Sequence, residues 1–312
     1  MRDILDLPHS DPLRVKAAAD LAADRQVLEL AETQKADGTW GRFHSQDTKV
    51  KEKQQFITTE VAINRALSIG LDRENIVLIK ATRFMRSVLN GTATWSDPPE
   101  KHEGWPIGIR LITAATLAKV DQYDPVLDGI WQTWADVLGK TFASGFYSDA
   151  EERRAHRVIN GIITKYKYPK LAAIYPLLLL SATGNKLPRD LETVYLDWIW
   201  HKKDGIYYLT WFSLDQFPEL GAKEFPFWLE AIGLLARFDH WASQHAEKII
   251  SFLWQCRNRE GLWDLPAGAS SISGAKKCSV QISESWRNPV NREIDCSIRI
   301  LSLIKVLYNV IG

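Results

Sequence analysis

Acidic side chains stand at a few places in this 312-residue chain where the pattern predicts an apolar helix. Glu60 and Glu230 each interrupt an otherwise apolar helical pattern, and Glu293 and Asp295 open the apolar run that continues through Leu301. A carboxyl group in such a setting is either satisfied by a hydrogen bond or used in chemistry such as proton transfer. For Glu293 and Asp295 the structural alternative is a favourable interaction with the dipole of the helix they begin.

A second acidic cluster is formed by Asp149, Glu151 and Glu152 and runs directly into Arg153 and Arg154. Opposite charges at this spacing favour a solvated helix start over an acid catalyst. The cysteines do not indicate a metal site or disulfides, because the three are odd in number and lack the spacing of metal ligands. We therefore expect no metal and no cofactor, and a reducing, cytoplasmic setting.

Length and composition favour one domain that spans residues 1–312. With 46% hydrophobic and 25% charged residues, the chain can bury a large core without disulfides. The formal net charge of +1 gives no global argument for nucleic acid or for an anionic membrane. The first residues lack an apolar signal core, and no run approaches the length of a transmembrane helix.

Two segments end a helix-like apolar run with Gln and then carry Gly-x-Trp. The first has Gly38 and Trp40 after Gln34, and the second has Gly261 and Trp263 after Gln255. Degenerate copies lie between them, with Trp95, Phe146 and Tyr207 after glycines. The aromatic residues recur about every 50 to 60 residues, a period that accommodates two helices and two loops. A glycine that adopts positive φ can end each helix, and the aromatic ring can pack on the next hairpin.

The coarse pattern predicts helices throughout and few strands. After an amino-terminal helix at about 12–23, helices are expected at 56–69, 73–89, 107–120, 125–138, 151–163, 169–181, 188–200, 226–238, 245–255 and 292–310. Residues 267–277, rich in Gly, Ser and Ala, are the best candidate for a mobile loop.

On these motifs, the chain resembles the α/α toroid superfamily of terpenoid cyclases and protein prenyltransferase β subunits. Its repeats look closest to squalene-hopene cyclase, and the resemblance covers about residues 27–310. It implies an all-α fold, an α/α toroid of repeated helical hairpins with QW-type motifs. The helices beginning near residues 56, 107, 169, 226 and 292 would then form the inner ring, and the amino-terminal helix would pack on the ring.

The resemblance also implies an activity, that of a class II terpene cyclase. Such enzymes start a carbocation cascade with the middle acid of Asp-x-Asp-Asp, a segment that this sequence lacks. Asp295 falls on the position of the proton donor and Glu293 on that of the first carboxylate, while Cys296 replaces the last one. The implied reaction is cyclisation or isomerisation of an elongated isoprenoid substrate without a cofactor, initiated by Asp295 and tuned by Glu293.

Aromatic residues gather near the starts of the expected inner helices. An aromatic wall there stabilises carbocations or fills the ring, and together these residues favour an apolar ligand chamber. The candidate substrate-binding residues, with the two acids inside helices, are Trp105, Tyr168, Tyr175, Phe227, Trp228, Glu60 and Glu230.

Two other functions remain open. One is a non-catalytic toroid that binds an apolar ligand or acts as a scaffold, and the other is an α/α-toroid glycoside hydrolase or lyase, since those also place paired carboxylates in an aromatic-lined ring. The zinc site of prenyltransferases is not expected, because Asp295 and Cys296 are adjacent and no His follows them. The expected partner is a small isoprenoid-like molecule, with peripheral membrane contact open and no oligomeric state specified.

Overall fold

The structure is a computed structural model that describes residues 7–8, 10–45, 56, 58–98, 104–162, 168–265 and 280–312. This part of the chain consists of helices and loops and contains no strand, so the expected all-α class is confirmed. Its one isolated bridge joins Ala173 to Tyr207. Residues 267–277, expected to form a mobile loop, lie outside the described residues.

The helices occupy nearly all of the expected positions. In chain order they are α2 (Pro12–Ala22), α3 (Arg25–Thr33), α4 (Thr59–Ser68), α5 (Ile76–Leu89), α6 (Trp105–Val120), the 3-10 turn η1 (Pro125–Leu127), α7 (Asp128–Thr141), α8 (Asp149–Asn160), α9 (Ile174–Ser181), α10 (Arg189–Trp200), α11 (Phe225–Leu235), α12 (Asp239–Gln255) and α14 (Pro289–Ile311).

Two helix starts differ by five residues or more from the sequence-based expectation. Helix α12 begins at Asp239 rather than at residue 245, because the amphipathic pattern continues back through the buried Trp241. Helix α9 begins at Ile174 rather than at residue 169, because the preceding residues pair with a neighbouring turn. The amide of Tyr207 donates to the Ala172 carbonyl at 2.8 Å, and the Ile174 amide donates to the Tyr207 carbonyl at 3.2 Å.

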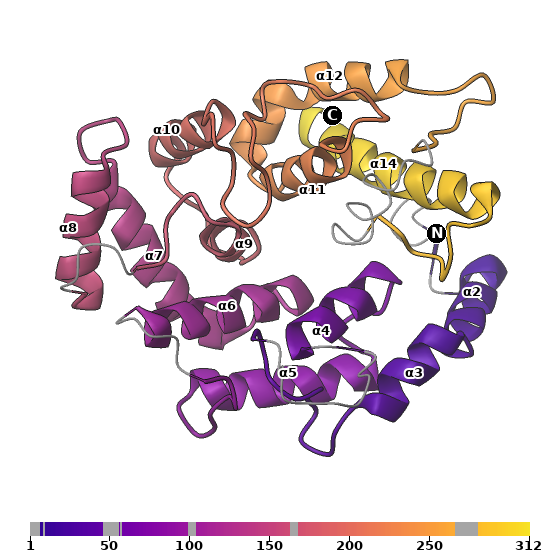
Figure 1. The fold of residues 1–312 in the computed structure, drawn as a ribbon, viewed down its shortest axis with the longest axis horizontal. Coiled ribbons are helices and arrows are strands. Elements are labelled where there is room, and N and C mark those ends of the chain that lie inside the picture. The colour runs from indigo at the N-terminus through magenta and orange to yellow at the C-terminus, as the bar shows by residue number, and fades with distance from the viewer. Residues whose placement is uncertain are drawn as a thin grey trace.

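Inner and outer helices alternate along the chain. Figure 1 shows α4, α6, α9, α11 and α14 toward the centre, with α3, α5, α7, α10 and α12 farther out and α8 outermost beside α7. Neighbouring inner helices contact one another from α4 to α6, from α6 to α9 and from α9 to α11, and α14 packs on α12. The helices α4, α6, α11 and α14 each begin after a turn at a glycine, whereas α8 comes between Gly145 and α9.

The five glycine turns share one backbone geometry. Each glycine has a positive φ, which any other residue adopts at a cost, and each donates its N–H to the carbonyl three residues earlier. The glycines are Gly38, Gly91, Gly145, Gly205 and Gly261. Each turn follows the end of an outer helix, so one connection is used five times.

The first and last turns also place their tryptophans alike. The indole N–H of Trp40 donates to the Leu30 carbonyl at 3.1 Å, and that of Trp263 donates to the Leu253 carbonyl at 2.7 Å. The backbone N–H groups of the two tryptophans donate to the hydroxyl groups of Thr59 on α4 and Ser297 on α14, respectively. Each tryptophan therefore joins an outer helix to the next inner helix.

The two glutamines are not equivalent. Gln34 is the C-cap residue of α3, and its amide donates to the carbonyl groups of Gly38 at 2.9 Å and Val77 at 2.8 Å. Gln255 is the last residue of α12, followed by Cys256 as the cap. In the first turn, Gln34 thus links neighbouring hairpins. In the last turn, Gln255 stands one position earlier relative to the end of its helix.

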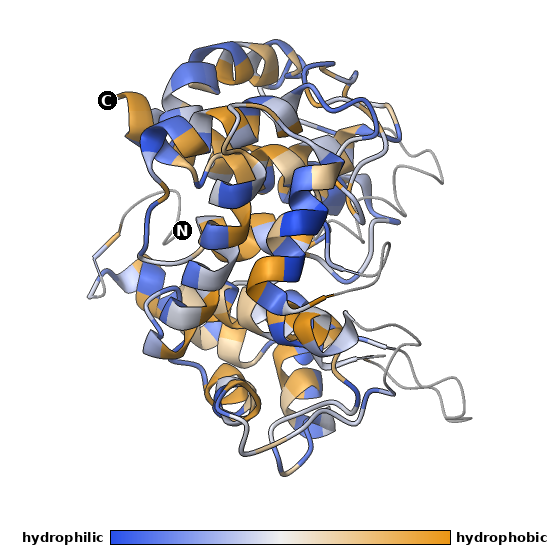
Figure 2. Cartoon of the chain, turned by 90° about the vertical axis from the view of Figure 1, so that its left-hand side faces the viewer, coloured by the Kyte–Doolittle hydropathy of each residue, from blue (hydrophilic) through white to orange (hydrophobic). Residues whose placement is uncertain are grey.

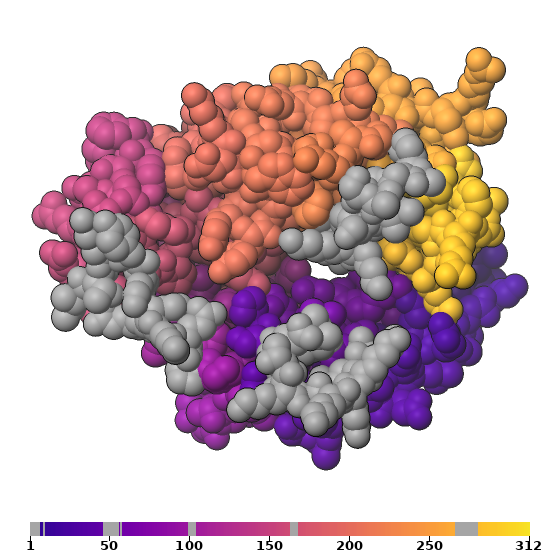
Figure 3. Space-filling view, in the orientation of Figure 1, coloured from indigo at the N-terminus to yellow at the C-terminus, as the bar shows by residue number. Residues whose placement is uncertain are grey.

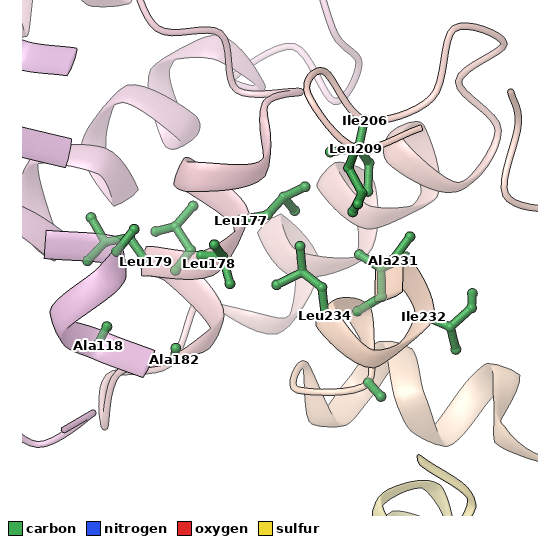
Figure 4. Close-up of a cluster of buried hydrophobic side chains, with 14 of the residues drawn as sticks. Ala118, Leu177, Leu178, Leu179, Ala182, Ile206, Leu209, Ala231, Ile232 and Leu234 are labelled. Carbon is green, nitrogen blue, oxygen red and sulfur yellow. The ribbon is translucent and has the colours of Figure 1, made fainter. Parts of the chain in front are cut away.

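Leucine and alanine side chains fill the space between the inner helices. Figure 4 shows side chains of α9 between Ala118 of α6 on one side and Leu234 of α11 on the other. Leu177 and Leu179 are fully buried, and small residues on α6 allow α9 to approach closely. Figure 2 shows hydrophobic and hydrophilic segments alternating along the helices, as expected for helices with one buried face.

Arginines join the first hairpin to the carboxy-terminal part of the chain. Arg65 on α4 donates to the carbonyl groups of Gln281 at 2.6 Å and Ile282 at 2.7 Å. Arg299 on α14 donates back to the Ser68 carbonyl at the end of α4. The expected amino-terminal helix is present as α2, which contacts α3 and buries none of its residues.

Candidate functional site

Three polar side chains from separate parts of the chain meet where inner helices begin. Oε2 of Glu60 lies 2.7 Å from Nδ1 of His44, and the Tyr175 hydroxyl donates to Oε1 of Glu60 at 2.9 Å. Glu60 is in the first turn of α4, and Tyr175 is in the first turn of α9. We call these three residues the Glu60 cluster.

The loop that carries His44 is held by a buried carboxylate. Asp97 accepts the backbone N–H groups of Phe43 at 2.6 Å, His44 at 2.9 Å and Ser45 at 2.7 Å. The Phe43 ring stacks on Trp95 with centroids 4.3 Å apart. Because three successive amides are fixed by one carboxylate, the His44 ring is positioned before any ligand binds.

The electrostatics of the Glu60 cluster favour a protonated phenol. Burial, and then the charge of Glu60, raise the pKa of Tyr175 far above its usual range. The phenol therefore remains a hydrogen-bond donor to Glu60 at every physiological pH. Glu60 keeps 14% of its side chain exposed and His44 keeps 26%, so the cluster is enclosed but reachable.

Exposed aromatic rings border the Glu60 cluster. The rings of Tyr175 and Tyr208 lie 6.5 Å apart, and Tyr208 has a positive φ of 71°. This conformation is costly for a tyrosine, and the pairing of Tyr207 with the residues before α9 holds it in place. Tyr207, Tyr208 and Trp211 expose 58%, 61% and 49% of their surface, respectively, and Trp211 packs edge-on against Phe227.

A cavity of about 300 Å³ lies farther along the inner helices, and a larger one of about 810 Å³ adjoins it. Both are lined by Lys119, Arg237 and Val306. Leucines of α9, α11 and α14 line the smaller cavity together with Glu230 and Arg299. The expected apolar chamber therefore has a mixed lining, because charged residues interrupt the inner faces of these helices.

Tyr175 of the Glu60 cluster and Leu178 of the smaller cavity lie on the same face of α9, and Phe227 and the cavity residue Glu230 lie on one face of α11. Tyr175 and Leu178 on α9, and Phe227 and Glu230 on α11, are three residues apart, a spacing that puts each pair on one face. On α4, Asn64 follows Glu60 by four residues and accepts a hydrogen bond from Lys119 at 2.8 Å. Figure 3 shows an opening near the centre of the molecule.

Asp295, the expected proton donor, is enclosed by the segment that precedes its helix. Its Oδ2 accepts the N–H groups of Ile282 at 3.0 Å and Ser283 at 2.8 Å, the Ser283 hydroxyl at 2.6 Å and the Trp286 indole at 2.7 Å. Only 3% of Asp295 is exposed. Four donors on one oxygen stabilise the carboxylate and fasten residues 282–286 to α14.

The other two residues of that motif do not join Asp295 in a reactive group. Glu293 accepts a hydrogen bond from the exposed amide of Asn258 at 2.6 Å. Cys296 is buried, and burial raises the pKa of its thiol to about 12, so it stays neutral. The geometry of the motif is that of an anchored helix start.

Three of the other expected site residues, Trp105, Trp228 and Tyr168, are buried at separate places in the core. Trp105 is buried at the start of α6, and Trp228 is fully buried with its indole donating to the Leu214 carbonyl at 3.1 Å. Tyr168 lies instead beside α8, where Lys170 donates to its hydroxyl at 2.8 Å. Of the expected residues, the structure brings together Glu60 and Tyr175.

The carboxylates of the second acidic cluster make hydrogen bonds that hold α8 in place. Glu152 is fully buried and accepts the Leu171 amide at 2.6 Å and the Tyr147 hydroxyl at 2.8 Å. Asp149 is partly exposed and accepts a hydrogen bond from Lys170 at 2.6 Å. These bonds fasten α8 to the segment that leads into α9.

Sequence reasoning missed His44, Asp97, Lys119 and Arg237. Lys119 carried a usable signal, because it is a lone charge at the end of the apolar run on α6, as Glu60 and Glu230 are in theirs. His44 and Asp97 lie in loops without helical periodicity, and only the fold brings them together.

Among the described residues, no group of His, Cys, Asp and Glu side chains is arranged to hold a metal ion. None of the described helices has both the length and the apolar character needed to cross a membrane. No protein-family model, curated protein or solved structure matches the chain.

Proposed function

We propose that this chain is a single α/α toroid with QW-type repeats that cyclises or isomerises an isoprenoid substrate by proton transfer. The alternation of inner and outer helices and the five equivalent glycine turns support the toroid. The matching bonds of Trp40 and Trp263 support the repeats. The Glu60 cluster is the single observation that carries the reaction.

In this proposal, Glu60 is the acid that protonates a substrate alkene. The carboxylate that remains accepts a hydrogen bond from the Tyr175 hydroxyl and contacts the His44 ring, and both contacts hold it in place for proton transfer. The exposed ring of Tyr208 lies 6.5 Å from that of Tyr175, and aromatic rings stabilise cations. Transfer of a proton from carbon to the Glu60 carboxylate then gives the cyclised or isomerised alkene and restores the acid.

Asp295 takes a different role in this proposal from the one its sequence position implies. A proton donor must be reachable by the substrate, whereas only 3% of Asp295 is exposed and its Oδ2 accepts four hydrogen bonds from its own segment. We assign Asp295 to the structure of the α14 start and Glu60 to the chemistry.

A polysaccharide lyase is the second candidate, favoured by the exposed rings of Tyr207, Tyr208 and Trp211 beside a His and a Tyr. Sugar rings stack on exposed aromatic faces, and His and Tyr can move the protons of β-elimination. The purified protein is therefore incubated with polyprenyl diphosphates, polyprenyl alcohols and uronate polysaccharides. An isomeric isoprenoid product supports the cyclase, an unsaturated uronate product supports the lyase, and ligand binding without turnover supports a binding protein.

A further inference from the structure

Three cationic side chains and one carboxylate line the 300 Å³ cavity. Lys119 comes from the last turn of α6, Arg237 from the end of α11 and Arg299 from the middle of α14, with Glu230 on α11 as the carboxylate. The cavity walls therefore carry two positive charges in excess. An excess of this kind in an enclosed space favours a bound anion.

Two of these cations are enclosed by protein and yet touch solvent. Arg237 is an exposed residue and Lys119 is half-buried, although dense protein surrounds both. Each side chain lines a cavity that is partly open to solvent, so protein lies close to it while part of its surface stays accessible. Burial lowers the pKa of both groups, and the opposing effect of the Glu230 charge is smaller in each case.

Their hydrogen bonding differs from that of a structural arginine nearby. Arg65 donates to the carbonyl groups of Gln281 and Ile282, and these hydrogen bonds give it a structural role. Lys119 has one bond in the described part of the chain, to the Asn64 side chain. Within the same described residues, the guanidinium group of Arg237 makes no hydrogen bond or ion pair. Donors of this strength in a cavity are suited to a charged acceptor.

We propose that this cavity binds a phosphate or diphosphate group, with Lys119 and Arg237 as its main ligands. A ligand with a single carboxylate carries one negative charge and would leave one of the two excess positive charges unmatched. A phosphate group carries more negative charge and has several acceptor oxygens, which suit the planar fork of Arg237 and the point charge of Lys119. Neither ligand belongs to the Glu60 cluster.

The site deepens the proposed function and, for the hydrocarbon part of the ligand, rests on it. Asn64, the partner of Lys119, is one turn along α4 from Glu60. A prenyl diphosphate held by Lys119 and Arg237 would direct its chain along the inner helices toward the Glu60 cluster. The site thus specifies a substrate with an anionic end.

The test is titration calorimetry of the full-length chain with inorganic pyrophosphate and, separately, with inorganic phosphate. We expect wild type to bind pyrophosphate, and we expect Arg237→Gln and Lys119→Gln each to weaken binding by about tenfold or more, because each removes a charged donor. Arg237→Lys should retain part of the affinity. Arg154→Gln, which changes an exposed arginine on α8, is the matched control and should bind as wild type does.

Circular dichroism and the melting temperature check that each variant is folded. Folded wild type that binds no pyrophosphate would overturn the proposal, as would equal affinity in wild type, Arg237→Gln and Lys119→Gln. Glu60→Gln should bind pyrophosphate normally, which separates this site from the chemistry. Turnover of uncharged polyprenyl alcohols without pyrophosphate binding would exclude the anion site and support the proposed function. Pyrophosphate binding without turnover would support the anion site and exclude the proposed function.

A second titration identifies the source of the phosphate. A prenyl diphosphate that binds more tightly than inorganic pyrophosphate, and loses affinity in Arg237→Gln, supports the site as the anchor of a substrate. Equal affinity for the two ligands, with the same loss in Arg237→Gln, supports the site as one for the free anion.

Discussion

Glu60 connects the imidazole of His44 to the phenol of Tyr175, with its two carboxylate oxygens 2.7 Å from Nδ1 of His44 and 2.9 Å from the Tyr175 hydroxyl. The glutamate belongs to α4 and the tyrosine to α9, so this contact exists only in the folded chain. Because Asp97 fixes the amide groups of the His44 loop, the arrangement is held in place from outside the cluster.

Replacing Glu60 by Gln should abolish turnover while the protein stays folded. The amide keeps the shape of the side chain but has no acidic proton to donate, and loss of a general acid costs about 10²- to 10⁴-fold in rate. Tyr175→Phe should lower the rate less, because it removes one donor to the carboxylate. Steady-state kinetics and circular dichroism provide the measurements. A Glu60→Gln enzyme with wild-type turnover would exclude Glu60 as the acid.

Asp295→Ala should destabilise the fold and leave the turnover of folded molecules unchanged. The substitution leaves the donors of Ile282, Ser283 and Trp286 unsatisfied, at a cost on the order of 3 kcal/mol or more. Glu293→Ala is the matched control, because its exposed bond to Asn258 is worth at most about 1 kcal/mol. Urea unfolding measures both. An Asp295→Ala protein with unchanged stability and no turnover would restore Asp295 as the proton donor.

Replacing glycine by alanine should lower the stability of the fold by different amounts at Gly38 and Gly91. A Cβ at Gly38 would lie 2.5 Å from the Lys80 carbonyl oxygen, whereas one at Gly91 would meet nothing within 4 Å. Both glycines have positive φ, so Gly91→Ala should cost about 1 kcal/mol from the backbone alone. Gly38→Ala should cost several times more, since the backbone of α5 must also move. Similar melting temperatures for the two variants would contradict the close approach of the Gly38 turn to the backbone of α5.

His156 predicts a loss of stability in acid. Burial, and then the charge of Lys170, lower the pKa of His156 from 6.5 to about 4. Between these pH values the unfolded chain therefore binds more protons than the folded chain. The stabilisation of the fold that this pKa difference gives is complete above pH 6.5 and is lost as pH falls toward 4. Its size is on the order of 3 kcal/mol. His156→Gln should flatten the pH dependence of urea unfolding in this window, and the exposed His201→Gln should not. An unchanged slope in His156→Gln would contradict the assignment.

The parts of the fold that follow from local chemistry could be predicted. Apolar periodicity located the helices, and Gly38 and Gly261 marked turns because a helix end needs a positive φ there. The start of α9 could not be placed from sequence, because it depends on the pairing of Ala172 and Ile174 with Tyr207, a residue far along the chain.

The candidate site was predictable only in part. Glu60 and Tyr175 were noticed because an acid in an apolar helix and an aromatic at a helix start are visible in the sequence. Their contact with each other, and with His44, depends on how α4, α9 and a loop are arranged in space. Asp295 shows the converse, because its position in the sequence suggests an acid catalyst while its four hydrogen-bond donors come from a segment without a recognisable pattern.

The most direct test of the proposed chemistry is product mass after incubation with polyprenyl diphosphates in D₂O. We predict that wild type and Arg154→Gln give an isomeric product that carries one deuterium on carbon, and that Glu60→Gln gives none. A product without deuterium would contradict initiation by protonation, and a deuterated product from Glu60→Gln would show that another group is the acid.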